Sequence, residues 1–106
     1  MDAMEVIENN YNAKADSFLY YLQDKSIFNK DAFRLLLESI RKVADEGVDI
    51  SRTAQKINVI YSKILKCLLY NFDANDDYKI INLPENYNKL IALLDKNVEY
   101  YFSTRI

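Results

Sequence analysis

An acidic segment carries the spacing in this chain that comes closest to a metal site. Asp73, Asn75 and Asp77 repeat the opening ligands of a calcium-binding EF-hand loop. The sixth position of that loop is Tyr78, where the sharp turn needs glycine, and the twelfth is Pro84, where a bidentate glutamate belongs. We therefore expect an ordinary polar turn at this segment, with no metal and no cofactor.

Groups that catalyse reactions are scarce in the sequence. It contains no histidine, which removes the usual general base and the usual zinc ligand. Cys67 is the only cysteine, and because no oriented base accompanies it we expect a small apolar filler at the edge of the core. Carboxylate pairs such as Glu5 with Glu8 share one helix surface instead of facing each other across a cleft. We expect that the protein is not an enzyme.

The elements that position these residues are predicted to be helices. Gly47 and Pro84 are the only glycine and proline, so the chain has few residues that favour turns. Apolar residues recur at intervals of three and four, which is typical of amphipathic helices. We expect four helices and a tail, at about residues 3–23, 30–46, 50–72, 84–102 and 103–106. The fold class predicted is all-α: a single domain, 1–106, forming an antiparallel up-down-up-down four-helix bundle.

Polar residues between the apolar runs indicate the helix ends. Asn29 or Asp31 is expected to cap the second helix, and Asp49 or Ser51 the third. Gly47 is expected to end the second helix and Pro84 to open the fourth. Residues 78–82 have strand propensity, but a lone strand has no pairing partner, so we expect an extended loop.

Charge and hydropathy limit the partners. The net charge is −2, which gives no support for binding nucleic acid. The N-terminal residues are acidic and lack the apolar core of a signal peptide, and no apolar stretch approaches the ~20 residues that span a bilayer. We expect a monomer in the cytoplasm.

The third predicted helix contains a basic surface. No acidic residue occurs at 51–72, whereas Arg52, Lys56, Lys63 and Lys66 cluster on one arc of the helix, which we expect to lie opposite its apolar face. This surface is a candidate for binding an acidic partner or, weakly, the anionic inner leaflet of the membrane. A solvated lysine face that pairs with acidic neighbours explains the same pattern, and both interpretations stay open.

The C-terminal end is rich in aromatic residues. Tyr100, Tyr101 and Phe102 are consecutive, so they cannot all point the same way on a helix, and at least one is expected to be exposed. Together with Arg105 and Ile106 they are candidates for partner binding, because exposed tyrosine and arginine are common binding anchors. The alternative is a hydrophobic clasp that holds the last helix on the bundle.

Over about residues 15–100, the pattern of four helices, with a polar third helix, an aromatic end to the fourth and a short tail, resembles a known family. This family is the immunity proteins of pediocin-like (class IIa) bacteriocins, called the enterocin A immunity family. The segment Ile57-Asn58-Val59-Ile60-Tyr61-Ser62-Lys63-Ile64 is similar to the third helix of several members. Leu83-Pro84-Glu85, before the fourth predicted helix, is similar to streptococcal members.

The resemblance implies a specific function. Such a protein stays in the cytoplasm of a Gram-positive producer cell, where a peripheral position at the inner face of the membrane is also compatible with the family. It protects the cell by recognising a mannose phosphotransferase permease that the bacteriocin has engaged. Specificity in the family is attributed to the C-terminal half, which here means the last two predicted helices and residues 100–106. The alternative that we keep is a small helical adaptor or regulator, encoded by a phage or plasmid, that binds another protein without catalysis.

Overall fold

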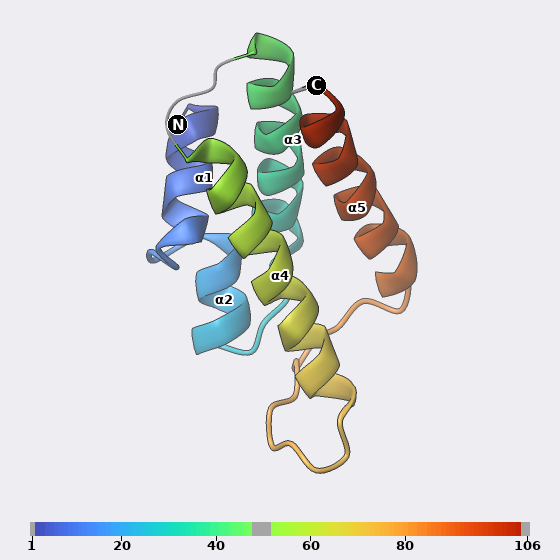
Figure 1. Ribbon diagram of the computed structural model, residues 1–106. Helices are drawn as coiled ribbons and strands as arrows, with labels where there is room; N and C mark the ends of the chain where they lie inside the picture. The colour runs from blue at the N-terminus through green and yellow to red at the C-terminus, as the bar shows by residue number, and fades with distance from the viewer. Residues whose placement is uncertain (1, 48–51, 105–106) are drawn as a thin grey trace.

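The protein is all-helical in the part that the computed structural model describes, residues 2–47 and 52–104. These residues form five helices and no strand, so a bundle of four helices is not confirmed (Figure 1). The helices are α1 (Ala3–Tyr11), α2 (Phe18–Asp24), α3 (Lys30–Glu46), α4 (Thr53–Phe72) and α5 (Tyr87–Ser103). The all-α class is confirmed.

The helix predicted at 3–23 is two helices, because polar residues interrupt it. The Asn10 side chain donates to the carbonyl of Val6 and accepts the N–H of Leu19 at 3.1 Å, so it joins the end of α1 to the start of α2. Ala13 takes a positive φ of 49°, which ends α1, and Ser17 caps α2. The apolar spacing continues across the interruption, and this is why periodicity alone predicted one helix.

The other helices begin and end near the predicted positions. Asn29 caps α3 by accepting the N–H of Ala32 at 3.0 Å, and Gly47 ends it with a left-handed φ of 63°. Helix α4 begins at Thr53, directly after Arg52. The candidate caps Asp49 and Ser51 lie outside the described residues.

Pro84 does not open the last helix. Its carbonyl accepts the N–H of Tyr87 at 3.1 Å in a turn, and α5 begins three residues later than predicted.

The helices do not pack in their order along the chain. Helix α3 lies mainly against α1 and α5, whereas α4 lies mainly against α1 and α2. Helices α3 and α5 run side by side in the same direction, whereas α1, α2 and α4 run in the opposite direction (Figure 1). The up-down-up-down order predicted antiparallel contacts between consecutive helices, and it did not indicate this close contact between two parallel helices.

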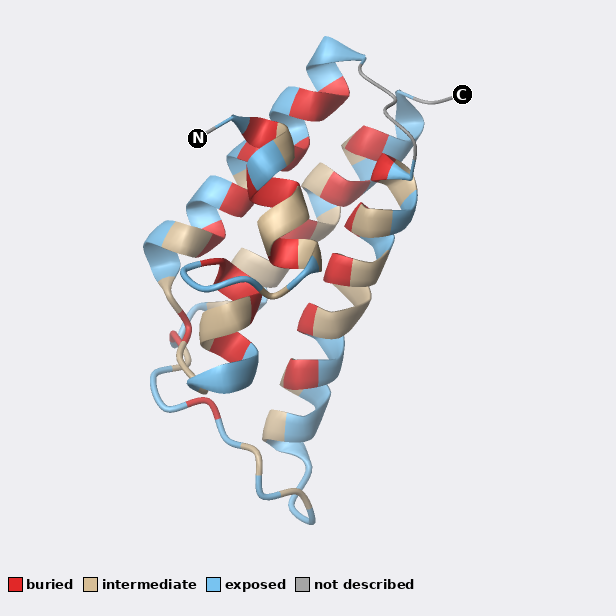
Figure 2. Ribbon diagram, turned by 90° about the vertical axis from the view of Figure 1, so that its left-hand side faces the viewer, coloured by how far each residue is buried: buried red, intermediate tan, exposed pale blue. Residues whose placement is uncertain are grey.

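The core is aliphatic at its centre and aromatic at one end. Figure 2 shows the buried residues of each helix facing the interior. Phe18, Phe28 and Phe33 form a ring cluster with centroids 5.0–5.1 Å apart, where α2 meets α3. Cys67 is buried at the edge of this core, as predicted, and burial raises the pKa of its thiol.

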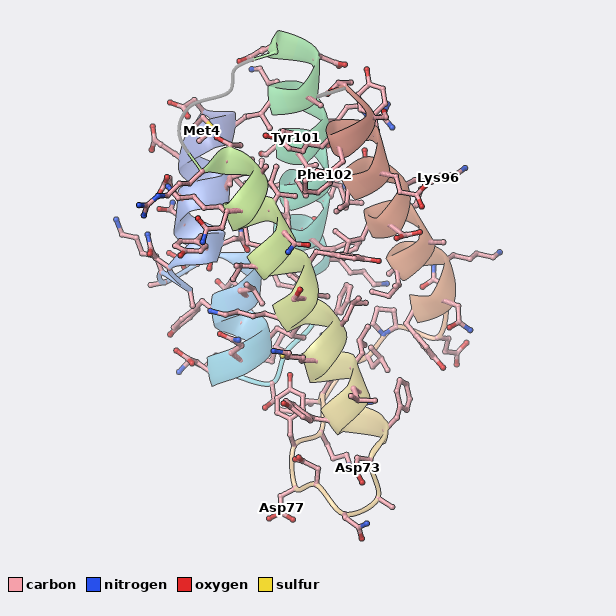
Figure 3. All side chains as sticks on the ribbon, viewed as in Figure 1. Met4, Asp73, Asp77, Lys96, Tyr101 and Phe102 are labelled. Carbon is pink, nitrogen blue, oxygen red and sulfur yellow. The ribbon has the colours of Figure 1, made fainter. Side chains whose placement is uncertain are left out.

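The loop after α4 is held by its own polar groups. Asp73 accepts the N–H of Asn75 at 2.9 Å, and Asp76 accepts the N–H of Tyr78 at 2.8 Å. Their carboxylates thus shape turns, as expected for a polar loop. Asp73 and Asp77 lie at the end of the molecule formed by this loop (Figure 3). Residues 78–80 form no helix or strand, whereas residues 81 and 82 lie in a turn, so the absence of a strand at 78–82 agrees with the prediction but its extended course is only partly matched.

Candidate functional site

The basic residues of α4 do not form one exposed surface. Arg52 is exposed, with a left-handed φ of 73°, directly before the helix. The Lys56 ammonium pairs with Glu8 of α1, and only 19% of its side chain is exposed. It also lies 5.7 Å from the centre of the Tyr11 ring. Lys56 therefore fastens α4 to α1 and is a poor candidate for contacting a partner.

Helix geometry explains the position of Lys56. Each residue turns the helix by about 100°, so Lys56 lies only about 80° from buried Ile64, whereas Lys66 lies about 160° from it. Lys63 is half-buried and Lys66 is exposed, in agreement with this order. The expectation that all four basic residues lie opposite the apolar face of α4 is wrong for Lys56 and Lys63.

The three aromatic residues near the C-terminus point in different directions. Tyr101 is 0% exposed and lies in the core, so it is not a partner-binding residue (Figure 3). Phe102 is 37% exposed and touches the Tyr101 ring edge-on, with centroids 5.3 Å apart. The clasp interpretation is thus confirmed for Tyr101, whereas Phe102 reaches the surface. Arg105 and Ile106 lie outside the described residues.

Tyr100 belongs to the seam between α3 and α5. The Arg41 guanidinium lies over its ring at 3.7 Å from the centroid, and Arg41 also donates to Asn97 at 3.0 Å. The Tyr100 hydroxyl donates to Asp45, and this hydrogen bond raises the pKa of Tyr100. These contacts fix Tyr100 and leave part of its ring exposed.

A second apolar surface on α4 was missed in the sequence. Leu65, Leu69 and Phe72 are 37%, 68% and 56% exposed, and their spacing of four and three places them in one line. We call these three residues the α4 apolar stripe. The residues buried in the core, such as Ile64 and Cys67, lie on another side of the same helix. The sequence does contain a signal for this stripe. An amphipathic helix needs one apolar face, and the sequence of the last turns of α4 has two.

The α4 apolar stripe runs between charges of opposite sign. Lys66 is exposed on one side of it, about 100° around the helix from Leu65. On the other side, the Tyr61 hydroxyl donates to Asp95 of α5 at 2.6 Å, and Glu99 lies close enough to act on it. The hydrogen bond to Asp95 and burial raise the pKa of Tyr61 to about 12.

The last turns of α4 extend past the neighbouring helices, which leaves the stripe uncovered (Figure 1). No α4 residue after Cys67 is buried. The Phe72 ring packs against Tyr87 at 5.2 Å between centroids, which holds it in place at the start of α5. An uncovered apolar line with a fixed aromatic at its end is typical of a surface that binds another protein.

Residues 2–47 and 52–104 contain no group of histidine, cysteine, aspartate and glutamate side chains arranged to hold a metal ion. Among the described helices, none has the length and apolar character needed to cross a bilayer.

A comparison with known protein families, curated proteins and solved structures finds no match to this chain.

Proposed function

We propose that this chain is a bacteriocin immunity protein that acts by binding and not by catalysis. The observation that carries the proposal is the α4 apolar stripe, an uncovered apolar surface in the C-terminal half of the chain. The resemblance at residues 57–64 and 83–85 attributes specificity to that half. In this proposal the protein is cytoplasmic and binds the complex of the bacteriocin with the mannose phosphotransferase permease from inside the cell.

The binding surface that we propose combines the stripe with residues from the sequence-based set. Lys66 is exposed beside Leu69. Phe102 also reaches the surface, but it lies at the far end of α5 from Tyr87, on which Phe72 packs, so it is not part of this surface (Figure 3). Lys63 is half-buried on the basic side of α4. Apolar contact would supply most of the affinity, and the lysines would favour a partner that carries acidic residues on one edge.

A four-helix bundle remains our proposal for the domain as a whole. Helices α1 and α2 follow each other along one side of α4, and both contact it. Joined by Asn10, they would take the place of one long helix, with α3, α4 and α5 as the other three.

Expression of the chain in a strain sensitive to pediocin-like bacteriocins tests the function. We expect the inhibitory concentration of at least one toxin in a panel to rise when the protein is present, with an unrelated helical protein of similar size as control. No increase for any toxin in the panel would contradict the proposal.

The second candidate is a helical adaptor that binds a protein other than the permease. The charges on the two sides of the stripe favour it, because Lys66 on one side and Asp95 on the other suit an amphipathic partner helix from many kinds of protein. Cross-linking in cells with and without bacteriocin separates the candidates. Capture of a permease subunit that depends on the toxin supports immunity, whereas capture of one cytosolic protein in both conditions supports the adaptor.

A further inference from the structure

A pocket lies between the N-terminal halves of α3 and α5, on a seam that the α4 apolar stripe does not touch. We call it the α3–α5 pocket. Its volume is about 270 Å³, and its lining residues are Lys30, Phe33, Arg34, Leu37, Asn86, Leu90 and Leu93. It lies where α3 and α5 run side by side: Phe33 is buried, Leu37 and Leu90 are half-buried, and Leu93 is 46% exposed.

The polar residues of the pocket are cationic or neutral. Lys30 and Arg34 are both exposed, and no carboxylate belongs to the lining. Arg34 pairs with Asp31 at 3.0 Å, but the two side chains are 70% and 89% exposed, so this pair is weak and Arg34 is free to exchange partners. Both helices begin at this end, and the positive ends of their dipoles add to the field of the two cations.

The pocket opens at one end, past Arg34 and Leu37, onto a second, shallower hollow of about 420 Å³. The lining of that hollow mixes cations with carboxylates, Arg41 and Lys42 with Glu38 and Asp45, whereas the charged residues that line the α3–α5 pocket are both cations. An acidic side chain is therefore favoured at the pocket itself, beside Lys30 and Arg34, and an open apolar surface of this kind suits a segment of a protein.

We propose that the α3–α5 pocket binds a segment of a partner protein that carries acidic and large apolar side chains. The apolar side chain would rest on Leu37, Leu90 and Leu93, and a carboxylate beside it would pair with Lys30 and Arg34. This combination of an apolar anchor and charge-assisted hydrogen bonds is common at peptide-binding sites. The inference goes beyond the function proposed above and does not depend on the partner of α4.

Selection from a library of short random peptides displayed on phage tests the proposal. The selection uses the Leu69→Glu variant, because a charge on the α4 apolar stripe removes a competing apolar surface. We expect the selected peptides to combine aspartate or glutamate with leucine, phenylalanine or tryptophan. Their affinity for the wild-type chain is then measured by fluorescence polarisation.

Two variants locate the binding. The double variant Lys30→Glu with Arg34→Glu should weaken the selected peptides by about tenfold or more, since it removes two charge-assisted contacts. Leu93→Asp should weaken them as well. The matched control is Lys14→Glu with Lys25→Glu, which reverses two exposed lysines elsewhere and should leave the affinity unchanged.

Three results of the peptide experiment would overturn the proposal. These are no enriched peptide, peptides without acidic residues, and peptides that bind the Lys30→Glu/Arg34→Glu variant as tightly as the wild type. Binding of anionic lipid vesicles that the same double variant abolishes would assign the pocket to a lipid and would also overturn it. Circular dichroism of each variant confirms that it is folded.

Discussion

Tyr101 and Phe102 are adjacent in the sequence and have different roles in the fold. Tyr101 is fully buried, whereas Phe102 is 37% exposed. We expect Tyr101→Ala to lower the free energy of unfolding by about 3–5 kcal/mol, as for other large aromatic residues in cores. Phe102→Ala should cost about 1 kcal/mol or less. Urea denaturation measures both, and equal losses would contradict the assignment of Tyr101 to the core.

Tyr61 makes stability depend on pH in the alkaline range. Its pKa is about 12 in the folded protein, against 10.0 for an ordinary tyrosine, with the hydrogen bond to Asp95 as the main cause. The folded state therefore binds this proton more tightly than the unfolded state. Its contribution to stability is complete below pH 10 and is lost as the pH rises through about 12.

The Tyr61→Phe variant isolates that contribution. We expect the unfolding free energy of the wild type to fall more steeply above pH 10 than that of the variant. Ultraviolet absorbance should show that the variant lacks one tyrosine that ionises only at a pH near 12. Identical pH profiles would show that the hydrogen bond to Asp95 does not protect the Tyr61 proton.

Charge reversal of Lys56 is a test of stability and not of binding. Lys56 pairs with Glu8 and is mostly buried. The Lys56→Glu variant would place two carboxylates together in a half-buried site, which destabilises the contact between α1 and α4. Lys66→Glu reverses an exposed charge instead, and it should leave the melting temperature within about 2 °C of the wild type, as measured by circular dichroism.

At the scale of elements, Asn10 decides whether the first part of the chain is one helix or two. Its amide accepts the buried N–H of Leu19 and donates to Val6. We expect Asn10→Ala to cost about 1–3 kcal/mol, because it leaves the Leu19 N–H without its acceptor. Asn12→Ala, at an exposed position in the same interruption, is the control and should change stability by less than about 0.5 kcal/mol. Equal effects would contradict the bridging role.

The helices that sequence predicted well are those whose ends carry strong local signals. Helix α3 begins after the cap Asn29 and ends at the left-handed Gly47, and the Asn29 side chain and the Gly47 N–H each bond to a backbone group three residues away. The interruption between α1 and α2 depends on Asn10 reaching Leu19, nine residues away. The start of α5 likewise depends on a turn at Pro84 and not on a capping side chain. Contacts of this kind do not alter apolar periodicity, so the sequence pattern did not reveal them.

At the scale of the whole molecule, the order in which helices pack determines the exposed surfaces. Placing α5 beside α3 buries Tyr101, opens the α3–α5 pocket and leaves the end of α4 uncovered. The candidate site was therefore predictable only in part. Lys66 lies at the surface as expected, and Phe102 is exposed where at least one of the three aromatic residues was expected to be. Leu65 and Leu69 were not identified, because the apolar pattern alone does not say which of two apolar faces a neighbour covers.

The central claim is that the protein works by binding a partner through the α4 apolar stripe. Leu69→Glu tests it, because Leu69 is 68% exposed and a charge there blocks apolar contact with little effect on folding. Leu35→Glu is the matched control, since Leu35 is 42% exposed on α3, away from the stripe. Both variants should keep the circular dichroism spectrum of the wild type.

The most direct measurement is the inhibitory concentration of the bacteriocin for a sensitive strain that expresses each variant at equal level. We predict that Leu35→Glu protects the strain as the wild type does, whereas Leu69→Glu reduces protection by at least about tenfold, in line with the loss of a central apolar contact. Full protection by the folded Leu69→Glu variant would contradict the claim.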